Sequence, residues 1–243
     1  MRRVRFRDEA GTERTGAWAD GEIRAAGRTY DPAAVTIRPP VEPTKIVCVG
    51  WNYRDHIEEK GAEIPDRPEL FLKPPNALSS HGATVPLPPD KEPIEYEAEF
   101  GVVIGEQCRN VDAADAERVV DGYTCVNDLS NREDQWEEQN WFRGKAFDNA
   151  APIGPVVADP ADVPDDARIR SRLNGETRQD SSIDQFIWSV GELIEEITAL
   201  VTLEPGDVIA TGTPYGVGEL SDGDHVEIEI EGIGTLENAV RAE

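Results

Sequence analysis

The sequence is poor in cysteine and lysine and contains no long apolar run. Its three cysteines, Cys48, Cys108 and Cys125, stand far apart. A disulfide framework and a CxxC metal motif are therefore excluded, and we expect three buried thiols. No stretch approaches the ~20 apolar residues that cross a bilayer. The N-terminus alternates arginine with Val4 and Phe6, unlike the uninterrupted apolar core of a signal peptide. We therefore expect a cytoplasmic protein with no membrane partner.

Basic residues are scarce throughout the chain. Only 24 lysines and arginines stand against 49 acidic residues, which gives a formal net charge of −25. Binding of nucleic acid requires a basic face, so a nucleic acid partner is not expected. Only five of the bases are lysine. A heavily acidic surface with little lysine suits a protein kept soluble in concentrated salt, where screening weakens self-repulsion. The composition therefore predicts a halophilic source.

Short apolar segments separated by glycine and proline predict an α+β protein that is mostly β. The proline cluster "IRPPVEPTK" divides the chain into a small N-terminal β unit, residues 1–43, and a main domain, residues 44–243. Helices are predicted at "WNYRDHIEEKG", which closes on a glycine, and at "VDAADAERVV". A third helix should follow Ser189, which forms a capping box with Glu192.

The stretch "EYEAEFGVVIG", residues 95–105, places three acids directly before an apolar run. In one β-strand, Glu95, Glu97 and Glu99 would point to the same face, because side chains alternate. The apolar run predicts burial on both faces, where unpaired carboxylates are costly. The acids therefore need either protons or a cation. Glutamates two residues apart on a strand start about 6.6 Å apart, and a hard divalent cation such as Mg²⁺ prefers such oxygen ligands.

A second stretch, "HVEIEIEG" at residues 225–232, has the same alternation in a different context. Glu227, Glu229 and Glu231 alternate with valine and isoleucine, and the segment ends at a glycine. This pattern predicts an ordinary half-buried strand with a solvated acidic face. Of the two stretches, only the first therefore suggests a metal site.

Asp128 is a third candidate ligand, at the end of the apolar segment "GYTCVND". Taken alone, such an aspartate is more often a turn former or a helix cap. Arg132 and Gln135 follow it by four and seven residues, which lets one helical stretch present a cation and an amide to the same space.

His56 and Glu59 form a candidate acid–base pair. They are three residues apart on a predicted helical turn and are therefore neighbours on one face. A carboxylate beside an imidazole fixes its tautomer and raises its basicity, as a general base for water requires. The same spacing also describes a surface histidine in an acidic helix, whereas His81 and His225 have no comparable partner and are interpreted as structural.

Lys145 is a candidate cation for an anionic substrate. It follows two aromatic residues and a glycine in "WFRGK", outside any charge run. Arg132 and Arg143 are further candidates, since an anion needs local cations in so acidic a protein. The segment "GDVIATGTPYGVG" is a strand that enters a glycine-rich turn, where backbone N–H groups and Thr213 could hold a carboxylate.

Several of these motifs, in this order, resemble the fumarylacetoacetate hydrolase (FAH) family. The matching segments are "KIVCVGWNYRDHIEEKG", "PELFLKPPNAL", "EYEAEFGVVIG", "VNDLSNREDQ", "GKAFDNAAPIGP", "LNGETRQ" and "PGDVIATGTPYGVG". The resemblance implies a β-sandwich-roll catalytic domain over residues 44–243 and a homodimer. It also implies that Glu97, Glu99 and Asp128 hold Mg²⁺ (or Mn²⁺), that His56, Glu59 and Lys145 are catalytic, and that Arg132, Gln135 and Thr213 face the substrate. One departure is Trp51, where many relatives have arginine.

The function that the resemblance implies is a Mg²⁺- or Mn²⁺-dependent hydrolase or isomerase acting on small anionic 2-oxo acids or their enols. Acylpyruvate-type C–C hydrolysis and 2-hydroxyhepta-2,4-diene-1,7-dioate isomerisation, both steps of aromatic catabolism, would proceed through a metal-stabilised enolate. An oxaloacetate decarboxylase or tautomerase and a sugar-acid dehydratase are alternatives within the family. A cation- or ligand-binding module without turnover is the alternative outside enzymology, and an intact His56–Glu59 pair argues against it.

Overall fold

The computed structural model describes residues 1–89, 91 and 93–242. Strands predominate over helices, which confirms the predicted α+β, mostly β, composition. The strands form three sheets, and the buried residues of the main domain and of the N-terminal strands join in one hydrophobic cluster. Cys48, Cys108 and Cys125 are all buried and free, as predicted.

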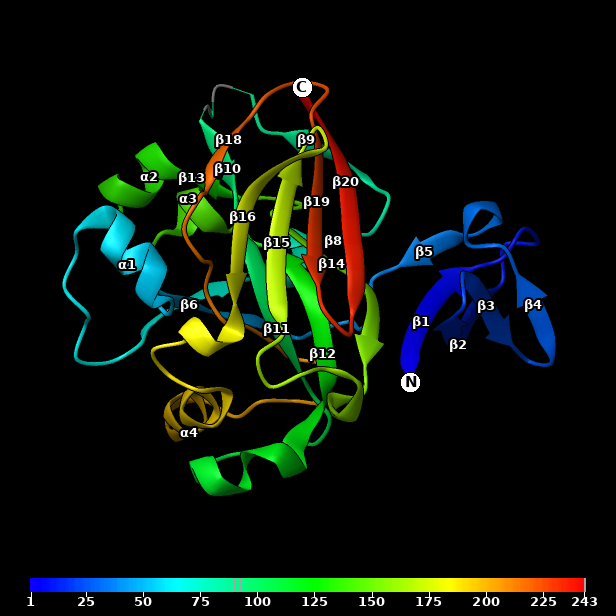
Figure 1. Ribbon diagram of the computed structural model, residues 1–243, viewed down its shortest axis with the longest axis horizontal. Coiled ribbons are helices and arrows are strands. Elements are labelled where there is room, and N and C mark those ends of the chain that lie inside the picture. Colours follow the sequence, from blue (N-terminus) through cyan, green and yellow to red (C-terminus); the bar gives the residue numbers. More distant parts are fainter. Residues whose placement is uncertain (90, 92, 243) are drawn as a thin grey trace.

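The largest sheet joins the N-terminal unit to the main domain. Its strand order is β4-β3-β2-β1-β14-β12-β11-β17-β6-β7, with β5 beside β1 and β8 beside β14. The bounds are β1 (Arg2–Arg7), β2 (Glu13–Ala19), β3 (Glu22–Ala25), β4 (Arg28–Tyr30), β5 (Thr36–Arg38), β6 (Ile46–Gly50), β7 (Glu69–Lys73), β8 (Leu78–Ser80), β11 (Ala98–Ile104), β12 (Val120–Asn127), β14 (Ala151–Ala158) and β17 (Val208–Ala210). Strands β1 to β5 form the small N-terminal β unit, which stands beside the main body in Figure 1. The domain boundary at residue 43 stays a prediction.

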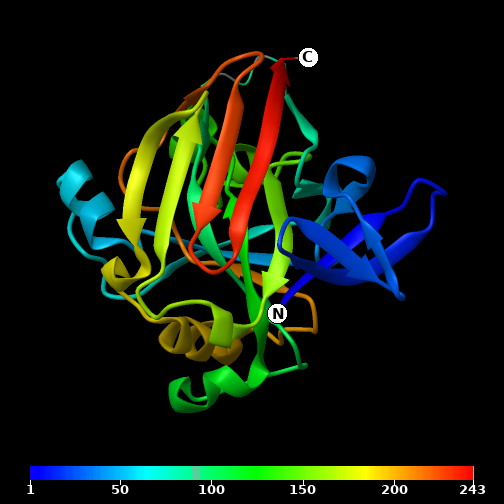
Figure 2. The same cartoon turned by 45° about the vertical axis from the view of Figure 1, so that its right-hand side comes forward.

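A five-stranded sheet, in the order β16-β15-β19-β20-β9, packs against the large sheet. Its strands are β9 (Thr84–Leu87), β15 (Arg168–Leu173), β16 (Glu176–Ser182), β19 (His225–Ile230) and β20 (Gly234–Ala242). Strands β15, β19 and β20 contact β11, β12 and β14, and Figure 2 shows the two layers face to face. The third sheet contains β13 (Ser130–Asn131), β10 (Ile94–Tyr96) and β18 (Gly218–Leu220), with β10 in the middle.

In the part of the chain that the structure describes, four short α-helices surround the sheets: α1 (Arg54–Lys60), α2 (Arg132–Glu137), α3 (Phe142–Lys145) and α4 (Val190–Leu200). Helix α1 ends at Gly61 in the left-handed conformation, and α4 begins with the predicted capping box of Ser189 and Glu192. The described residues also form five 3₁₀ helices: η1 (Pro32–Ala34), η2 (Pro75–Ala77), η3 (Ala113–Val119), η4 (Pro160–Asp162) and η5 (Ile183–Gln185). Among the residues that the structure describes, no helix combines the length and the apolar character needed to cross a membrane.

The predicted helix at "VDAADAERVV" is the 3₁₀ helix η3 rather than an α-helix. The segment is held at its start by Thr198 of α4, whose carbonyl accepts a hydrogen bond from the N–H of Asn110 (3.0 Å). At its other end it passes directly into β12 at Val120. The tighter 3₁₀ turn fits this short span between two fixed points, and 3₁₀ turns are common as connectors of this kind.

Candidate active site

The three acids of residues 95–105 do not lie on one continuous strand, so that prediction was wrong. Strand β10 ends at Tyr96, and β11 begins at Ala98 in a different sheet. Between them, the N–H of Glu97 donates to the side-chain oxygen of Asn127 (3.1 Å) instead of to a ladder partner. The alternation nevertheless persists across the break, and burial deepens along it: the fractional exposure of Glu97 is 5% and that of Glu99 is 1%.

The register of β11 and β12 brings Asp128 to these glutamates. Ala98 pairs with Asn127, so Glu97, one residue before, faces Asp128, one residue after. The N–H of Asp128 accordingly donates to the carbonyl of Glu97 (3.0 Å). One carboxylate oxygen each from Glu97, Glu99 and Asp128 lie within 4.8 Å of one another, and all three residues are buried. The structure thus brings together the three acids that the sequence nominates as metal ligands.

Lys145, at the end of α3, lies among the acids. Its ammonium donates to Glu97 Oε2 (2.8 Å), Asp128 Oδ2 (2.7 Å) and Ser130 Oγ (2.5 Å). Burial acts to lower the pKa of Lys145, but the neighbouring Asp128 and Glu97 raise it above its usual range. The lysine therefore stays charged, with two of its hydrogen bonds directed at the acid cluster and the third at Ser130.

Arg132, at the start of α2, is also committed to nearby side chains. Its Nε donates to Glu95 (2.5 Å), one terminal nitrogen donates to Gln135 Oε1 (2.7 Å), and the other pairs with Glu97. Burial alone would raise the pKa of Glu97, but Arg132 and Lys145 outweigh it and hold that pKa well below its usual range. Glu97 is therefore ionised.

Sequence analysis missed a second buried lysine, Lys73 at the end of β7. Its ammonium donates to the carbonyls of Leu129 (3.0 Å), Lys145 (2.6 Å) and Ala150 (2.9 Å). It also lies 2.7 Å from Asp128 Oδ1. Because its three hydrogens are directed at carbonyls, it supplies positive charge to Asp128 but no hydrogen bond to Oδ1. The only signal in the sequence is that one of five lysines closes the apolar segment "ELFLK".

Two features of the cluster test whether a metal would fit. Asp128 Oδ1 is buried without a hydrogen-bond partner. Glu99 has no ion-pair partner among the described residues and accepts one N–H, from Gly212 (3.1 Å). Burial, Asp128 and Glu97 together raise the pKa of Glu99 well above its usual range. Within the described part of the chain, Glu99, which has no cationic partner, and Asp128 Oδ1, which accepts no hydrogen bond, are the groups that a hard cation with oxygen ligands would satisfy. The residues present therefore fit Mg²⁺ or Mn²⁺.

The His56–Glu59 pair lies on α1. His56 Nδ1 is 3.3 Å from Glu59 Oε2, without the geometry of a hydrogen bond. Glu59 Oε1 accepts the N–H of Gly216 (3.2 Å), which anchors the carboxylate to the loop after β17. Burial lowers the pKa of His56, against the opposing attraction of Glu97 and Glu59. The imidazole is therefore neutral near pH 7, which is the form that can accept a proton.

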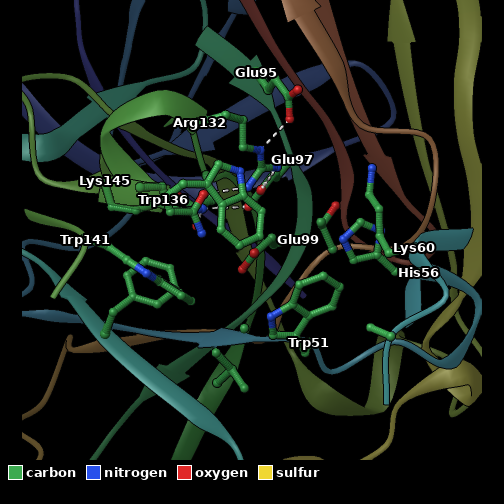
Figure 3. Close-up of a pocket in the computed structure, with 17 residues that line it drawn as sticks. Trp51, His56, Lys60, Glu95, Glu97, Glu99, Arg132, Trp136, Trp141 and Lys145 are labelled. Carbon is green, nitrogen blue, oxygen red and sulfur yellow. Dashed lines mark hydrogen bonds and ion pairs between the residues drawn. The ribbon is translucent and has the colours of Figure 1, made fainter. Parts of the chain in front are cut away.

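A cavity of ≈ 600 Å³ joins these groups, and Figure 3 shows the side chains around it. Its walls include eight of the nine site residues nominated from the sequence, namely His56, Glu97, Glu99, Asp128, Arg132, Gln135, Lys145 and Thr213, whereas Glu59 is not among the lining residues. Thr213 Oγ1 accepts a hydrogen bond from Gln179 Nε2 (2.8 Å), which fixes the hydroxyl at the wall. Arg143 instead lies on the exposed side of α3 and pairs with Glu138.

Comparisons with known proteins agree with this arrangement. A family model described as "Fumarylacetoacetate (FAA) hydrolase C-terminal" matches residues 45–241. The oxaloacetate tautomerase YisK of Bacillus subtilis is 40% identical over 225 residues, which cover 87% of this chain and 75% of YisK.

Solved structures extend the likeness to the fold. The 5-carboxymethyl-2-hydroxymuconate delta-isomerase from Mycobacterium smegmatis has a TM-score of 0.92 at 38% identity, covering 100% of this chain and 99% of that one. The maleylpyruvate hydrolase from Sphingobium has a TM-score of 0.86 at 28% identity, with 100% of each chain covered. The fold class expected from the resemblance is therefore confirmed, and the family model over residues 45–241 together with the 40% identical relative shows that the chain belongs to the fumarylacetoacetate hydrolase family.

Proposed function

We propose that the protein is a Mg²⁺- or Mn²⁺-dependent enzyme that acts on small 2-oxo acids or their enols. The observation that carries this proposal is the meeting of Glu97, Glu99 and Asp128, with oxygens within 4.8 Å of one another, at the wall of a cavity. The three names reported above, a tautomerase, an isomerase and a hydrolase, all belong to proteins of this fold. Acylpyruvate-type hydrolysis and dienedioate isomerisation are the activities that we propose first.

The metal would be held by Glu97, Glu99 and Asp128, and as a Lewis acid it would stabilise negative charge that develops on the oxygens of the 2-oxo acid. The neutral His56, oriented by Glu59, would take a proton from water for attack on a carbonyl of the substrate. Lys145 fixes the positions of Glu97 and Asp128. To donate to a substrate oxygen, it must first release one of its three present acceptors.

Oxaloacetate tautomerisation or decarboxylation and sugar-acid dehydration remain the alternatives within the family. The relation to YisK favours the first of these. The outcomes differ in their need for water: hydrolysis requires an activated water molecule, whereas decarboxylation does not. The His56→Ala variant should therefore lose hydrolysis and could keep decarboxylation. Equal loss of both would remove this distinction.

The proposal is tested by stripping the purified protein with a chelator and restoring Mg²⁺ or Mn²⁺. Acetylpyruvate, oxaloacetate and 2-hydroxyhepta-2,4-diene-1,7-dioate serve as substrates, and we expect turnover of at least one of them only after metal is restored. Turnover that is unaffected by chelation would refute the metal role. Metal binding without turnover of any 2-oxo acid would favour the alternative of a cation- or ligand-binding module.

Three further expectations accompany the proposal. The acidic composition suggests a halophilic source, and the family resemblance suggests a homodimer. The sequence suggests a cytoplasmic location. All three stay predictions. Gel filtration would check the homodimer, and activity measurements over a range of salt concentrations would check the halophilic source.

A further inference from the structure

Aromatic side chains form one side of the proposed substrate cavity. Trp51, Trp136, Trp141 and Phe71 all line it, so three of the chain's five tryptophans meet at this one site. They come from separate segments: the turn after β6, helix α2, the residue before α3, and strand β7. Figure 3 shows the rings of Trp51, Trp136 and Trp141 in the same pocket as Glu97 and Glu99.

Two of these tryptophans adopt a backbone conformation that bulky residues rarely take. Trp51 and Trp141 both have a φ of 57°, in the left-handed region that favours glycine and asparagine. The other described non-glycine residues with positive φ are small: Asp20, Ala26, Asn110, Asn149 and Asn174. Strain of this kind persists where surrounding structure enforces it and is concentrated at functional sites. Both bulky exceptions lie in the wall of the same cavity.

Neighbouring groups hold the rings in place. Trp51 stacks on His56, with ring centroids 5.3 Å apart and planes 23° apart. Trp141 meets the edge of Phe71 at 5.1 Å, and the tip of its ring lies 3.4 Å from where a Cβ on Gly50 would be. Trp136 is 73% exposed, so its indole is free to contact a ligand at the opening. The result is a preformed aromatic wall that begins at the proposed general base.

The cations around the cavity are already paired with protein groups. Arg132 and Lys145 bind acids of the cluster, and Lys73 binds three carbonyls beneath Asp128. The remaining described lysine at the cavity is Lys60, whose side chain is 45% exposed and whose Nζ lies 3.7 Å from Glu59. A metal would engage the 2-oxo acid end of a substrate. A second carboxylate, at the far end, would meet indole rings and no free buried cation.

We propose that this pocket selects 2-oxo acids that carry a single carboxylate and an uncharged, planar distal group, such as an aryl or conjugated alkenyl substituent. Aroylpyruvates have this chemistry, whereas dienedioates and oxaloacetate carry a second carboxylate. Aromatic rings stack favourably on indoles, and burial of an unpaired carboxylate against apolar walls is costly. The cavity volume of ≈ 600 Å³ also falls within the range of about 300–1,000 Å³ that holds drug-sized ligands, so it has space for such a group. The inference rests on the proposed function and narrows its substrate class: of the two activities proposed first, it favours acylpyruvate-type hydrolysis over dienedioate isomerisation.

Three probes with the same 2-oxo acid head separate the possibilities: 2-oxo-4-phenylbutanoate, 2-oxohexanoate and 2-oxoadipate. They differ in having an aryl, an aliphatic or an anionic distal end, and none has the second carbonyl required for hydrolysis. Binding to the Mg²⁺-loaded protein is measured by calorimetry and by quenching of tryptophan fluorescence. We expect the phenyl probe to bind about tenfold or more tightly than 2-oxoadipate.

Substitutions of the tryptophans test whether the aromatic wall causes the preference for the phenyl probe. Trp136→Ala, at an exposed position, and Trp51→Ala should each reduce the advantage of the phenyl probe over 2-oxohexanoate severalfold. Trp51→Arg should shift the preference toward 2-oxoadipate. Trp18→Phe, in the N-terminal unit, is the matched control and should change neither ratio. Circular dichroism verifies folding, and if Trp51 variants fail to fold, Trp136→Ala still decides.

The outcomes separate this inference from the proposed function. Failure of all three probes to bind the metal-loaded protein would refute both. Binding of all three without preference, or tighter binding of 2-oxoadipate, would refute the inference and leave the proposed function standing. If 2-oxoadipate binds more tightly and the Lys60→Gln variant loses this binding, Lys60 is the cation that binds the distal carboxylate.

Discussion

Two segments of this protein share the pattern Glu-x-Glu-x-Glu and have opposite environments. In β19, the side chains of Glu227 and Glu229 are 24% and 34% exposed. They lie opposite Arg172 and Arg170 of β15 in the antiparallel register and pair with them at the surface. At the β10–β11 junction, the buried Glu97 and Glu99 line the proposed substrate cavity instead.

The difference comes from what covers the strands. Strand β19 buries alternate residues only, so its acidic side stays in water. Strand β11 lies between β12 and β17 in the large sheet, and all seven of its residues are buried. Acidic alternation therefore indicates a solvated face when the strand is amphipathic, and a functional cluster when it leads into a strand that is buried on both faces.

Replacing one acid in each segment with glutamine should produce the largest difference in activity between the two regions. Glu99→Gln removes a proposed metal ligand, and we expect kcat/KM to fall on the order of 10³-fold, since loss of a single charge-stabilising group can cost this much. In the metal-free protein, burial beside Asp128 and Glu97 disfavours the ionised form of Glu99, and glutamine avoids the cost of keeping this group protonated, so the melting temperature of the metal-free protein near pH 7 should rise. Glu229→Gln should leave activity unchanged and alter stability by less than about 0.5 kcal/mol. Similar effects of both variants on activity would contradict the comparison.

Loss of a cation should also lower the free energy of unfolding more at the buried site than at the surface of β19. Lys73→Met leaves three buried carbonyls and Asp128 without their partner, and we expect the free energy of unfolding to fall by about 3 kcal/mol. Arg172→Met removes a half-exposed ion pair and should cost less than about 1 kcal/mol. Urea titrations of both variants measure these values, and equal losses would show that burial does not decide the strength of these pairs.

Two histidines extend the comparison to pH. Burial lowers the pKa of His56, so this base loses its proton at a lower pH than an ordinary histidine, whose pKa is about 6.5. With saturating metal, kcat/KM for hydrolysis should be level from about pH 8 down to about pH 6.5. At lower pH it should fall, by about tenfold for each unit below the pKa of His56. His225→Gln, on β19, should leave the profile unchanged, whereas a limb centred above pH 7 would contradict a buried neutral base.

Salt should produce the smallest effect. The Glu229 ion pair is partly exposed and contributes under about 1 kcal/mol at low ionic strength. In about 1 M KCl, where the Debye length is about 3 Å, the stability difference between wild type and Glu229→Gln should vanish. The loss caused by Lys73→Met should persist, because buried pairs are screened much less. Thermal melts at both salt concentrations make this measurement.

Local patterns in the sequence were sufficient for the mostly-β composition, for the capping box of α4 and for the glycine that ends α1. They also nominated the three acids, because Glu97, Glu99 and Asp128 stand at the ends of apolar segments. The break between β10 and β11 at Glu97 could not be predicted from the sequence, because the alternation of residue types continues unchanged across it. The break arises because β10 pairs with β13 and β18, which are distant in the sequence.

Other parts of the site leave little trace in the sequence. Lys73 donates its hydrogen bonds to backbone carbonyls. Every residue has a carbonyl, so the sequence does not show which residues will accept these bonds. The aromatic wall likewise depends on how α2 and the segment before α3 fold beside β6 and β7. Short-range spacing does not contain this tertiary information.

The two buried lysines bear on when the proposed metal ion would bind. A zinc finger gains its fold from its metal and is unfolded without it. Here Lys73 and Lys145 supply positive charge to Asp128 and Glu97 within the polypeptide itself. We therefore expect the cavity to form without the proposed divalent ion, which would then bind to a site that already exists in the folded chain.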